Sequence, residues 1–298
     1  MLDKLIHFLK KKPLPRVDCS HHRILKDPLL NQQLIQKGYI VLPFLNDNQI
    51  IYLKELYSKW HSDNQPTNFY KSYFSSDKQY LKEVENIIFE FFKPKLNEYL
   101  IDHDLFGGMF VVRPHGQEGN IPPHQDWSLL DETKHWSLNT WCPLDDTHSD
   151  FGIFKVLPGS HRFIQTIRGY GIPKHYGHLE DEIEKHFINL HMKAGEIVIF
   201  YHSLLHGSSM NLRQSPRVAV GCSVTPKNSQ LLYQMIADNE SKLRKYNVSK
   251  EFFSDYTYAR GKLPDQQLLV DTEQIKFELI SKKQLLEKIK QYNNPDLS

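Results

Sequence analysis

The segment from residue 106 to residue 225 constrains the fold more than any other part of this 298-residue chain. Short runs rich in β-branched and aromatic residues alternate there with breaks of Gly, Pro, Asn and Asp, which is typical of short strands joined by irregular loops. Several such strands in succession favour a mainly β fold with a jelly-roll core. The five clearest runs cover residues 109–113, 136–141, 152–157, 196–201 and 217–224.

Helical patterns dominate the chain before this segment. After a short buried strand at 38–43, Asn46 or Asp47 is placed to cap a helix that ends near Trp60. A second amphipathic helix is expected over about 77–99, because its apolar residues recur at helical spacing. We therefore expect these helices to pack against the β core and support it.

The whole chain, 1–298, is interpreted as a single domain. It divides into a helical amino-terminal support (1–105), a jelly-roll core (106–225) and a helical carboxyl-terminal extension (226–298). A polar insertion interrupts the core at 169–191. Further helices are expected inside the insertion and at the tail, over residues 179–186 and 281–291.

Three side chains from two separate segments have the composition of a metal site. His124 and Asp126 have the form His-x-Asp, and residues i and i+2 of an extended strand face the same way, so both can point at one ion. His206 supplies a second imidazole from a later segment. Two imidazoles and one carboxylate on one side of a metal are typical of non-haem Fe(II) oxygenases, because the opposite face stays open. His202 competes with His206, although its place at a strand end also suits a hydrogen-bonded core residue.

The three residues belong to a series of six motifs with a characteristic order and spacing. They are His124-Gln125-Asp126, Trp141-Cys142-Pro143-Leu144-Asp145-Asp146, Leu157-Pro158-Gly159-Ser160-His161, Gly195-Glu196-Ile197-Val198-Ile199-Phe200, His206-Gly207-Ser208 and Arg217. With these motifs the chain resembles the phytanoyl-CoA dioxygenase-like (PhyH-type) Fe(II)/2-oxoglutarate-dependent oxygenases, roughly over residues 38–225. The resemblance implies a double-stranded β-helix core (jelly-roll or cupin-like) packed by helices at both ends of the chain. It also implies that His124, Asp126 and His206 bind iron.

The resemblance further implies a site for the cosubstrate 2-oxoglutarate. Arg217 would hold its distal carboxylate, since a guanidinium offers a planar fork that matches a carboxylate; the alternative is an arginine at the barrel edge in a surface ion pair. Trp141 would line the cosubstrate pocket, or simply pack in the core. Weaker candidates for contacts with the cosubstrate, or with the residues that hold it and the metal, are Gln125, Asn139, Thr140 and Ser223. Arg113 is either near the pocket or exposed.

These features together predict an enzyme. The expected function is a non-haem Fe(II)- and 2-oxoglutarate-dependent dioxygenase that hydroxylates an unactivated C–H bond of a small molecule, consumes dioxygen and releases succinate and CO2. Asp126 favours hydroxylation, because related halogenases carry a small residue at this position. Two alternatives stay open: a Zn(II) hydrolase with the same three ligands, and a barrel that binds a metal or ligand without catalysis.

Charge and cysteine content limit the possible binding partners of the protein and the cellular compartment expected for it. A net charge of +2 without a basic stripe gives no sign of nucleic-acid binding. Cys19, Cys142 and Cys222 are too widely spaced for a disulfide framework, which favours a reducing compartment. Neither a signal peptide nor a membrane span is recognised, so a cytoplasmic location is expected. The oligomeric state cannot be read from the sequence.

The substrate is expected to be bound by three segments, 64–76, 129–135 and 169–184. They are polar and aromatic, and they lack the signature of a long apolar groove. The sequence therefore favours a small polar or aromatic metabolite over a long acyl chain. Candidate pocket walls are Phe69, Tyr70, Tyr73, Phe74, Trp127, Tyr170 and Tyr176.

Overall fold

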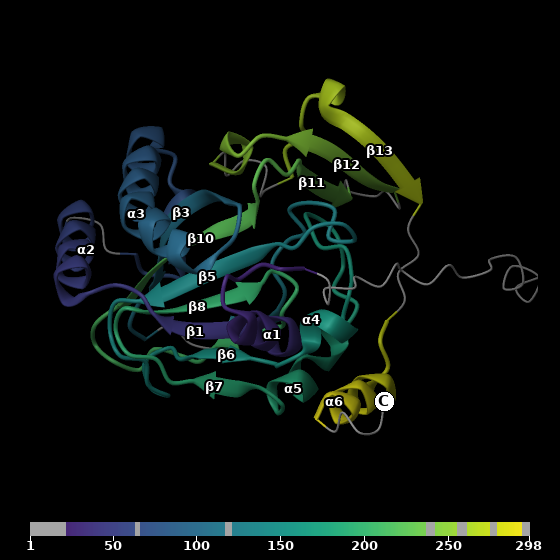
Figure 1. Ribbon diagram of the computed structural model, residues 1–298, viewed down its shortest axis with the longest axis horizontal. Helices are drawn as coiled ribbons and strands as arrows, with labels where there is room; N and C mark the ends of the chain where they lie inside the picture. The colour runs from purple at the N-terminus through teal and green to yellow at the C-terminus, as the bar shows by residue number, and fades with distance from the viewer. Residues whose placement is uncertain are drawn as a thin grey trace, which may run out of the picture.

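The computed structural model describes residues 22–62, 66–116, 121–236, 242–254, 261–274 and 279–293 (Figure 1). Cys19 and residues 64 and 65 of the first expected substrate segment lie outside these ranges. Antiparallel sheets form the centre of the molecule, and helices α1 to α3 pack beside the larger sheet. The prediction of a mainly β, jelly-roll core with added helices is confirmed.

The larger sheet contains six strands in the order β1-β8-β5-β10-β3-β2, and every neighbouring pair is antiparallel. Strand β8 has the bounds predicted from its apolar run, whereas β3 begins six residues before the run that indicated it. The strands are β1 (Tyr39–Pro43), β8 (Glu196–Tyr201), β5 (Leu138–Pro143), β10 (Arg217–Pro226), β3 (His103–Arg113) and β2 (Tyr70–Lys71). Residues 198–200 of β8 and 218–220 of β10 are all buried, which explains why these segments are continuously apolar.

A smaller sheet of four strands faces the larger one across the core. Its order is β4-β9-β6-β7. The Phe154 ring stacks on Trp141 and meets Phe200, both from the larger sheet, with ring centroids 5.2 Å apart in each case. The strands are β4 (Ile121–His124), β9 (His206–Ser208), β6 (Phe154–Val156) and β7 (Ile188–Leu190). Two sheets packed in this way form the jelly roll.

Three helices support the larger sheet. Asp27, Asn46 and Asp77 cap helices α1 (Pro28–Lys37), α2 (Asp47–Trp60) and α3 (Lys78–Tyr99), and Asn46 forms a reciprocal capping box with Gln49. Helices α2 and α3 bury one apolar face each in the same cluster as Phe110 and Val112 of β3. The predicted helices before the core are therefore confirmed, and they fix the position of β3 from behind.

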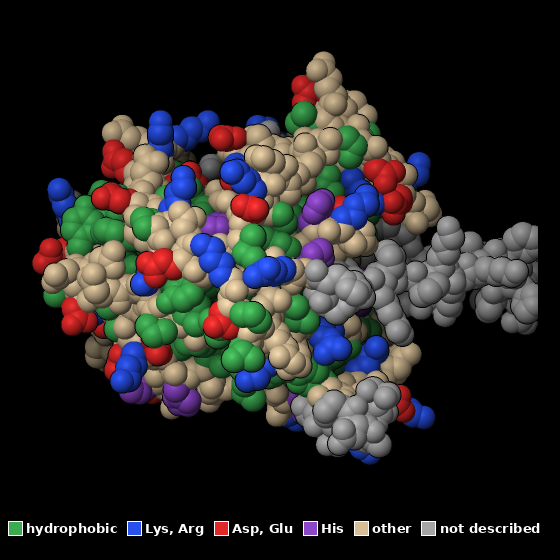
Figure 2. Space-filling view, in the orientation of Figure 1, with side chains coloured by type: hydrophobic (Ala, Val, Ile, Leu, Met, Phe, Trp, Pro, Cys, Tyr) green, Lys and Arg blue, Asp and Glu red, His purple; other side chains and the backbone are tan. Residues whose placement is uncertain are grey.

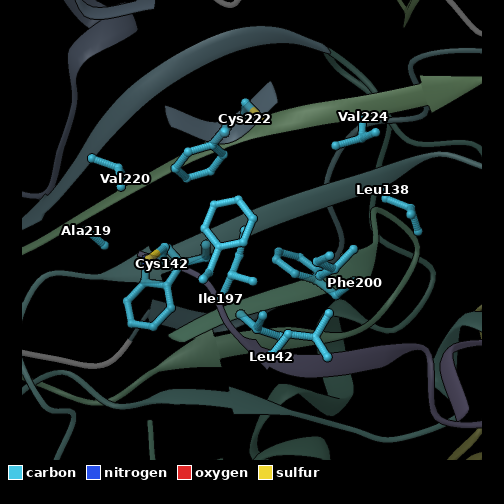
Figure 3. Packing of buried hydrophobic residues seen from close by; sticks show 14 of the residues in the cluster. Leu42, Leu138, Cys142, Ile197, Phe200, Ala219, Val220, Cys222 and Val224 are labelled. Carbon is cyan, nitrogen blue, oxygen red and sulfur yellow. The ribbon is translucent and has the colours of Figure 1, made fainter. Parts of the chain in front are cut away.

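The main core lies between the sheets and extends under the helices. Figure 3 shows buried side chains of β1, β5 and β8, among them Leu42, Cys142, Ile197 and Phe200. Each such side chain contributes about 1.5–3 kcal/mol when fully buried. Burial also raises the pKa of the Cys222 thiol to about 12, so this thiol stays protonated.

The sequence suggested a helical carboxyl-terminal extension, but the structure shows that the extension is only partly helical. Residues 226–298 contain an antiparallel three-stranded sheet before the final helix, which is α6 (Lys282–Asn293). The strands are β11 (Leu231–Ile236), β12 (Lys242–Val248) and β13 (Leu269–Gln274). Only β11 and one face of β12 are buried, while β13 is largely exposed and carries acidic side chains. The alternation of apolar and polar residues that indicates a strand was therefore weak in this segment.

The remaining elements of the described residues are short. The expected helix in the insertion is present as η3 (Gly177–Leu179) followed by α5 (Glu180–Glu184). The others are η2 (Ser72–Phe74), α4 (Ser160–Phe163), η4 (Glu251–Ser254) and η6 (Gln266–Leu268).

The visible surface is mixed in character. Figure 2 shows basic, acidic and hydrophobic side chains interspersed over one face of the molecule. Within the described ranges, no helix has both the length and the apolar character needed to cross a membrane.

Candidate metal centre

Strand pairing brings His124 and His206 together at one end of the smaller sheet. His124 is the last residue of β4, His206 is the first of β9, and their Cα atoms are direct partners in the antiparallel ladder. Their ring centroids are 4.1 Å apart. Asp126 follows two residues after His124, and its Oδ2 lies 3.8 Å from Nε2 of His206. One ligand atom from each of the three residues lies within 4.8 Å of the others.

Backbone carbonyls orient both imidazoles. Nδ1 of His124 lies 2.9 Å from the Pro122 carbonyl oxygen, and Nδ1 of His206 lies 2.9 Å from that of Leu204. A carbonyl can only accept, so each Nδ1 carries the proton and each Nε2 keeps its lone pair. Both Nε2 atoms are therefore prepared for a metal without any further change of tautomer.

The third ligand, Asp126, is held from two sides. Its backbone N–H donates to the His202 carbonyl at 2.8 Å, and the Asn139 side-chain amide donates to its Oδ2, also at 2.8 Å. These bonds fix the loop after β4 against both the β8–β9 turn and strand β5. The carboxylate consequently has one orientation before any ion arrives.

Electrostatics keep the three side chains in the protonation states that metals require. Burial lowers the pKa of His124 to about 3, with a smaller contribution from His206, and burial likewise lowers the pKa of His206. Burial alone would raise the pKa of Asp126, but His206 and then Lys71 outweigh it and hold that pKa well below the usual range. Neutral imidazoles and an ionised carboxylate are the ligand forms at neutral pH.

His202 has a different role from His206. Its Nδ1 lies 2.7 Å from the Ser137 hydroxyl and its Nε2 lies 3.3 Å from the Ser223 hydroxyl, so both ring nitrogens already have partners. Burial lowers the pKa of His202 to about 4, and the ring is neutral. It packs behind Asp126 and is not part of the three-residue cluster.

Arg217 lies inside the barrel and not at a surface ion pair. The residue is 1% exposed, its Nη1 donates to the Gly152 carbonyl at 2.6 Å, and its guanidinium lies 4.8 Å from the Trp141 ring centroid. Among the described residues, its Nε has no hydrogen-bond partner. Such a buried donor is costly unless a ligand completes it.

A second buried guanidinium lies beside the first. Arg113 is the direct cross-strand partner of Arg217 in the β3–β10 pair, which places both side chains on the same face of the sheet, and Arg113 is 2% exposed. Burial, and then the charge of Arg113, lowers the pKa of Arg217 to about 9. Two buried like charges at this position make an anion a favourable occupant. Arg113 is thus buried beside the pocket, not exposed.

Gln125 and Thr140 hold segments of the barrel together. The Gln125 amide donates to the backbone carbonyls of Ile164 and Ser203. The Thr140 hydroxyl donates to the Cys222 carbonyl and accepts from the Cys222 N–H, at 2.8 Å each. Both side chains therefore join segments of the barrel. Gln125 and Thr140 also line the cavities beside the metal cluster, and their contact with the cosubstrate stays a prediction. Sequence spacing indicated that they were near the site but not which way they pointed.

Two adjoining cavities open onto the metal cluster. The smaller one, about 60 Å³, is lined by His124, Asp126, His206, Trp141 and Arg217 among others. The larger one, about 410 Å³, is lined by His124, Asp126, Asn139, His202 and Ser223 together with aromatic side chains. The arrangement separates a small, positively charged compartment from a larger aromatic one.

Lys71 is a site residue that the sequence did not reveal. It lines both cavities, and its positive charge lowers the pKa of Asp126. It belongs to the two-residue strand β2, which pairs with Val111 and Val112 of β3. The only signal in the sequence was a lysine surrounded by aromatic residues at 69–74, which by itself indicates an exposed edge as readily as a pocket.

Comparison with known proteins agrees with this geometry. The family described as phytanoyl-CoA dioxygenase (PhyH) matches residues 53–219, which is more than half of the chain. The protein named phytanoyl-CoA dioxygenase of Arabidopsis thaliana is 29% identical over 122 residues, covering 39% of this chain and 42% of the relative. The chain thus matches less than half the length of this curated relative.

Two solved structures share the fold. The non-haem α-ketoglutarate-dependent carbocyclase SnoK from nogalamycin biosynthesis has a TM-score of 0.53 and 13% identity, covering 75% of this chain and 90% of SnoK. EctD from S. alaskensis, solved with 2-oxoglutarate and 5-hydroxyectoine, has a TM-score of 0.51 and 17% identity, covering 74% of this chain and 83% of EctD. At these identities the likeness concerns the fold.

Proposed function

Because this chain belongs to the phytanoyl-CoA dioxygenase family, we propose that it is a non-haem Fe(II)- and 2-oxoglutarate-dependent dioxygenase that hydroxylates an unactivated C–H bond of a small molecule. The proposed iron ligands are His124, Asp126 and His206. One observation carries the proposal: the three ligand atoms converge within 4.8 Å in a cavity that also contains the buried Arg217.

The donor set fits Fe(II). Two imidazole nitrogens and one carboxylate oxygen match the facial triad of such oxygenases. When bound with 2-oxoglutarate and dioxygen, the iron supplies the oxidising chemistry that yields succinate, CO2 and an alcohol. Asp126 occupies the position of the carboxylate ligand, which favours hydroxylation over halogenation.

The chain's own residues hold and orient the reactants. Arg217 is proposed to bind the distal carboxylate of 2-oxoglutarate with the guanidinium donors that the fold leaves available, while Trp141 covers one face of that guanidinium. Lys71 adds a positive charge at the junction of the two cavities. Asn139 fixes Asp126, and Ser223 fixes His202 behind it. The larger cavity is left for the substrate.

The first test is loss of the carboxylate ligand. The purified protein is reconstituted anaerobically with Fe(II) and 2-oxoglutarate and then exposed to air, and succinate is measured for the wild type and Asp126→Ala. We expect slow succinate formation in the wild type and none in the variant. The affinity of Asp126→Ala for Fe(II), measured by calorimetry, should be at least about a hundredfold lower than that of the wild type. Loss of a residue that only supports a metal ligand already lowers metal affinity ~10–100-fold.

An exposed aspartate provides the matched control. Asp150 pairs with Arg213 on the surface, so Asp150→Ala should keep both metal affinity and succinate formation. A wild-type protein that retains Zn(II) and binds neither Fe(II) nor 2-oxoglutarate would instead favour the zinc hydrolase. Binding of Fe(II) and 2-oxoglutarate without any succinate would favour a non-catalytic binding role.

A further inference from the structure

The larger cavity has walls that are mostly aromatic. Ring contacts join them into a continuous surface: Tyr233 lies 5.0 Å from Phe252 and 6.0 Å from Trp127, and Phe253 lies 5.7 Å from Phe106, measured between centroids. The aromatic residues lining it are Tyr73, Phe74, Phe106, Trp127, Tyr233, Phe252 and Phe253. A ligand in this cavity would therefore meet ring faces on several sides.

Part of this wall comes from a segment outside the family match. Tyr233 belongs to β11, and Phe252 and Phe253 belong to η4, all beyond residue 219 where the match ends. These residues pack in one cluster with Phe106 and Leu129. The three-stranded sheet after the barrel thus supplies the substrate side of the site with surface that the family match does not include.

A carboxylate besides that of Asp126 lines the same cavity. Glu85, on α3, accepts hydrogen bonds from the backbone N–H groups of Gly107 and Gly108 at 2.7 and 3.4 Å, and both bonds end on its Oε1. These two glycines form a bulge in β3, because two residues there lie opposite the single residue Cys222 of β10. The bonds fix the carboxylate and leave Oε2 available to the cavity that Glu85 lines.

The two cavities differ in the charged residues that line them. Arg217 lines only the smaller cavity, Lys71 lines both, and Glu85 lines only the larger one. Once Arg217 and Lys71 face an anionic cosubstrate, Glu85 is the remaining formal charge among the described residues around the larger cavity, apart from the metal ligands. Aromatic faces and a fixed carboxylate together favour an organic cation, since both attract positive charge.

We propose that the larger cavity binds the cationic group of a small substrate, such as an ammonium or trimethylammonium group, between Glu85 and the aromatic wall completed by Tyr233, Phe252 and Phe253. This inference rests on the proposed function, because it assigns the smaller cavity to 2-oxoglutarate. It deepens that function by naming the class of substrate.

The test compares a cation with its neutral isostere. Choline and 3,3-dimethylbutan-1-ol have the same shape and differ in the charge of the quaternary centre. Their dissociation constants are measured by calorimetry on the full chain loaded anaerobically with Fe(II) and 2-oxoglutarate. We expect choline to bind roughly tenfold more tightly than the alcohol, as a desolvated cation–π contact and a carboxylate would provide.

Two variants and one control locate the preference. Glu85→Gln keeps an acceptor for Gly107 and Gly108 but removes the charge, and Phe253→Leu removes a ring; each should reduce the preference for choline severalfold. Glu90→Gln, an exposed change on the same helix, should leave it unchanged. Equal binding of the two probes by the wild type, or an unchanged preference in both cavity variants, would overturn the proposal.

Binding of 2-oxoglutarate is measured in the same samples, so the two ideas fail separately. If the wild type did not bind 2-oxoglutarate, the proposed function would be contradicted. Normal 2-oxoglutarate binding without preference for the cation would contradict only the substrate class.

Discussion

Arg217 is placed where a charged side chain weakens the fold unless a ligand completes it. The guanidinium is buried beside a second one, and its Nε lacks a partner among the described residues. Burial of like charges costs free energy of folding, whereas an anionic ligand would recover it. The residue thus indicates a binding function more strongly than its position on a core strand does.

Arg217→Met should have opposite effects on stability and on ligand binding. The free energy of unfolding of the ligand-free protein should rise by about 1 kcal/mol, because an apolar chain of similar length replaces a buried charge. Affinity for 2-oxoglutarate should fall roughly 10–100-fold, as expected for loss of charged hydrogen bonds. Urea unfolding and calorimetry measure the two quantities.

The exposed Arg162 offers a control of the same type. Arg162→Met should change neither quantity appreciably. A loss of more than about 2 kcal/mol in Arg217→Met would show that Arg217 mainly supports the barrel, contrary to the expectation.

The pairing of β5 with β10 depends on a close approach of two backbones. A Cβ atom added at Gly221 would lie 2.2 Å from the Thr140 carbonyl oxygen, which is backbone and cannot rotate away. Strand β5 carries Asn139 and Trp141 into the site on either side of this contact. The position of both side chains therefore depends on the absence of a side chain on the neighbouring strand.

Replacing Gly221 by alanine should separate these strands. We expect Gly221→Ala to lower the free energy of unfolding by about 2–3 kcal/mol, as overpacking of a rigid core does. Gly177→Ala is the control, since its Cβ would be 3.6 Å from the Lys174 side chain, an ordinary contact. Thermal unfolding of both variants measures the difference; equal stability would mean that the barrel adjusts without cost.

Long elements with strong local signals could be predicted from the sequence. Asn46 and Asp77 each supply a capping side chain, so the starts of α2 and α3 were correctly located, and the apolar run of β8 fixed its limits. Strands β4, β7 and β9 have only three or four residues, too few for a periodic pattern. The exposed strand β13 carries acidic residues and no clear alternation, so it was assigned to a helical region.

The candidate site was only partly predictable for a related reason. His124, Asp126 and His206 converge as their spacing suggested, although their binding of iron stays a prediction. Lys71 could not be found, because its approach depends on β2 pairing with β3. The hydrogen bonds of Gln125 could not be found either, because its acceptors are the backbone carbonyls of Ile164 and Ser203, which lie far away in the sequence.

At the scale of the whole molecule, buried neutral histidines should make stability depend on pH. Burial lowers the pKa of His161 to about 3 and also lowers that of His61. In the unfolded chain these groups regain a pKa near 6.5, so the unfolded state binds more protons below that pH. Stability should therefore fall as the pH drops from about 6.5 toward 3.

His161 allows this expectation to be measured away from the metal centre. The free energy of unfolding of the metal-free protein should be lower at pH 5.5 than at pH 7.5, and His161→Gln should reduce that difference by about 1 kcal/mol. The exposed His178→Gln serves as the control. A pH difference that is unchanged in His161→Gln would contradict the role given to this ring.

The direct pairing of His124 with His206 makes the turn before β9 a spacer of fixed length. Residues 202–205 bridge β8 and β9, and the turn is bonded to the loop of Asp126 through the His202 and Ser203 carbonyls. Deleting one residue there would bring Gly207 opposite His124 and turn the imidazole of His206 to the other face of its strand. The turn can thus vary in composition far more readily than in the number of its residues.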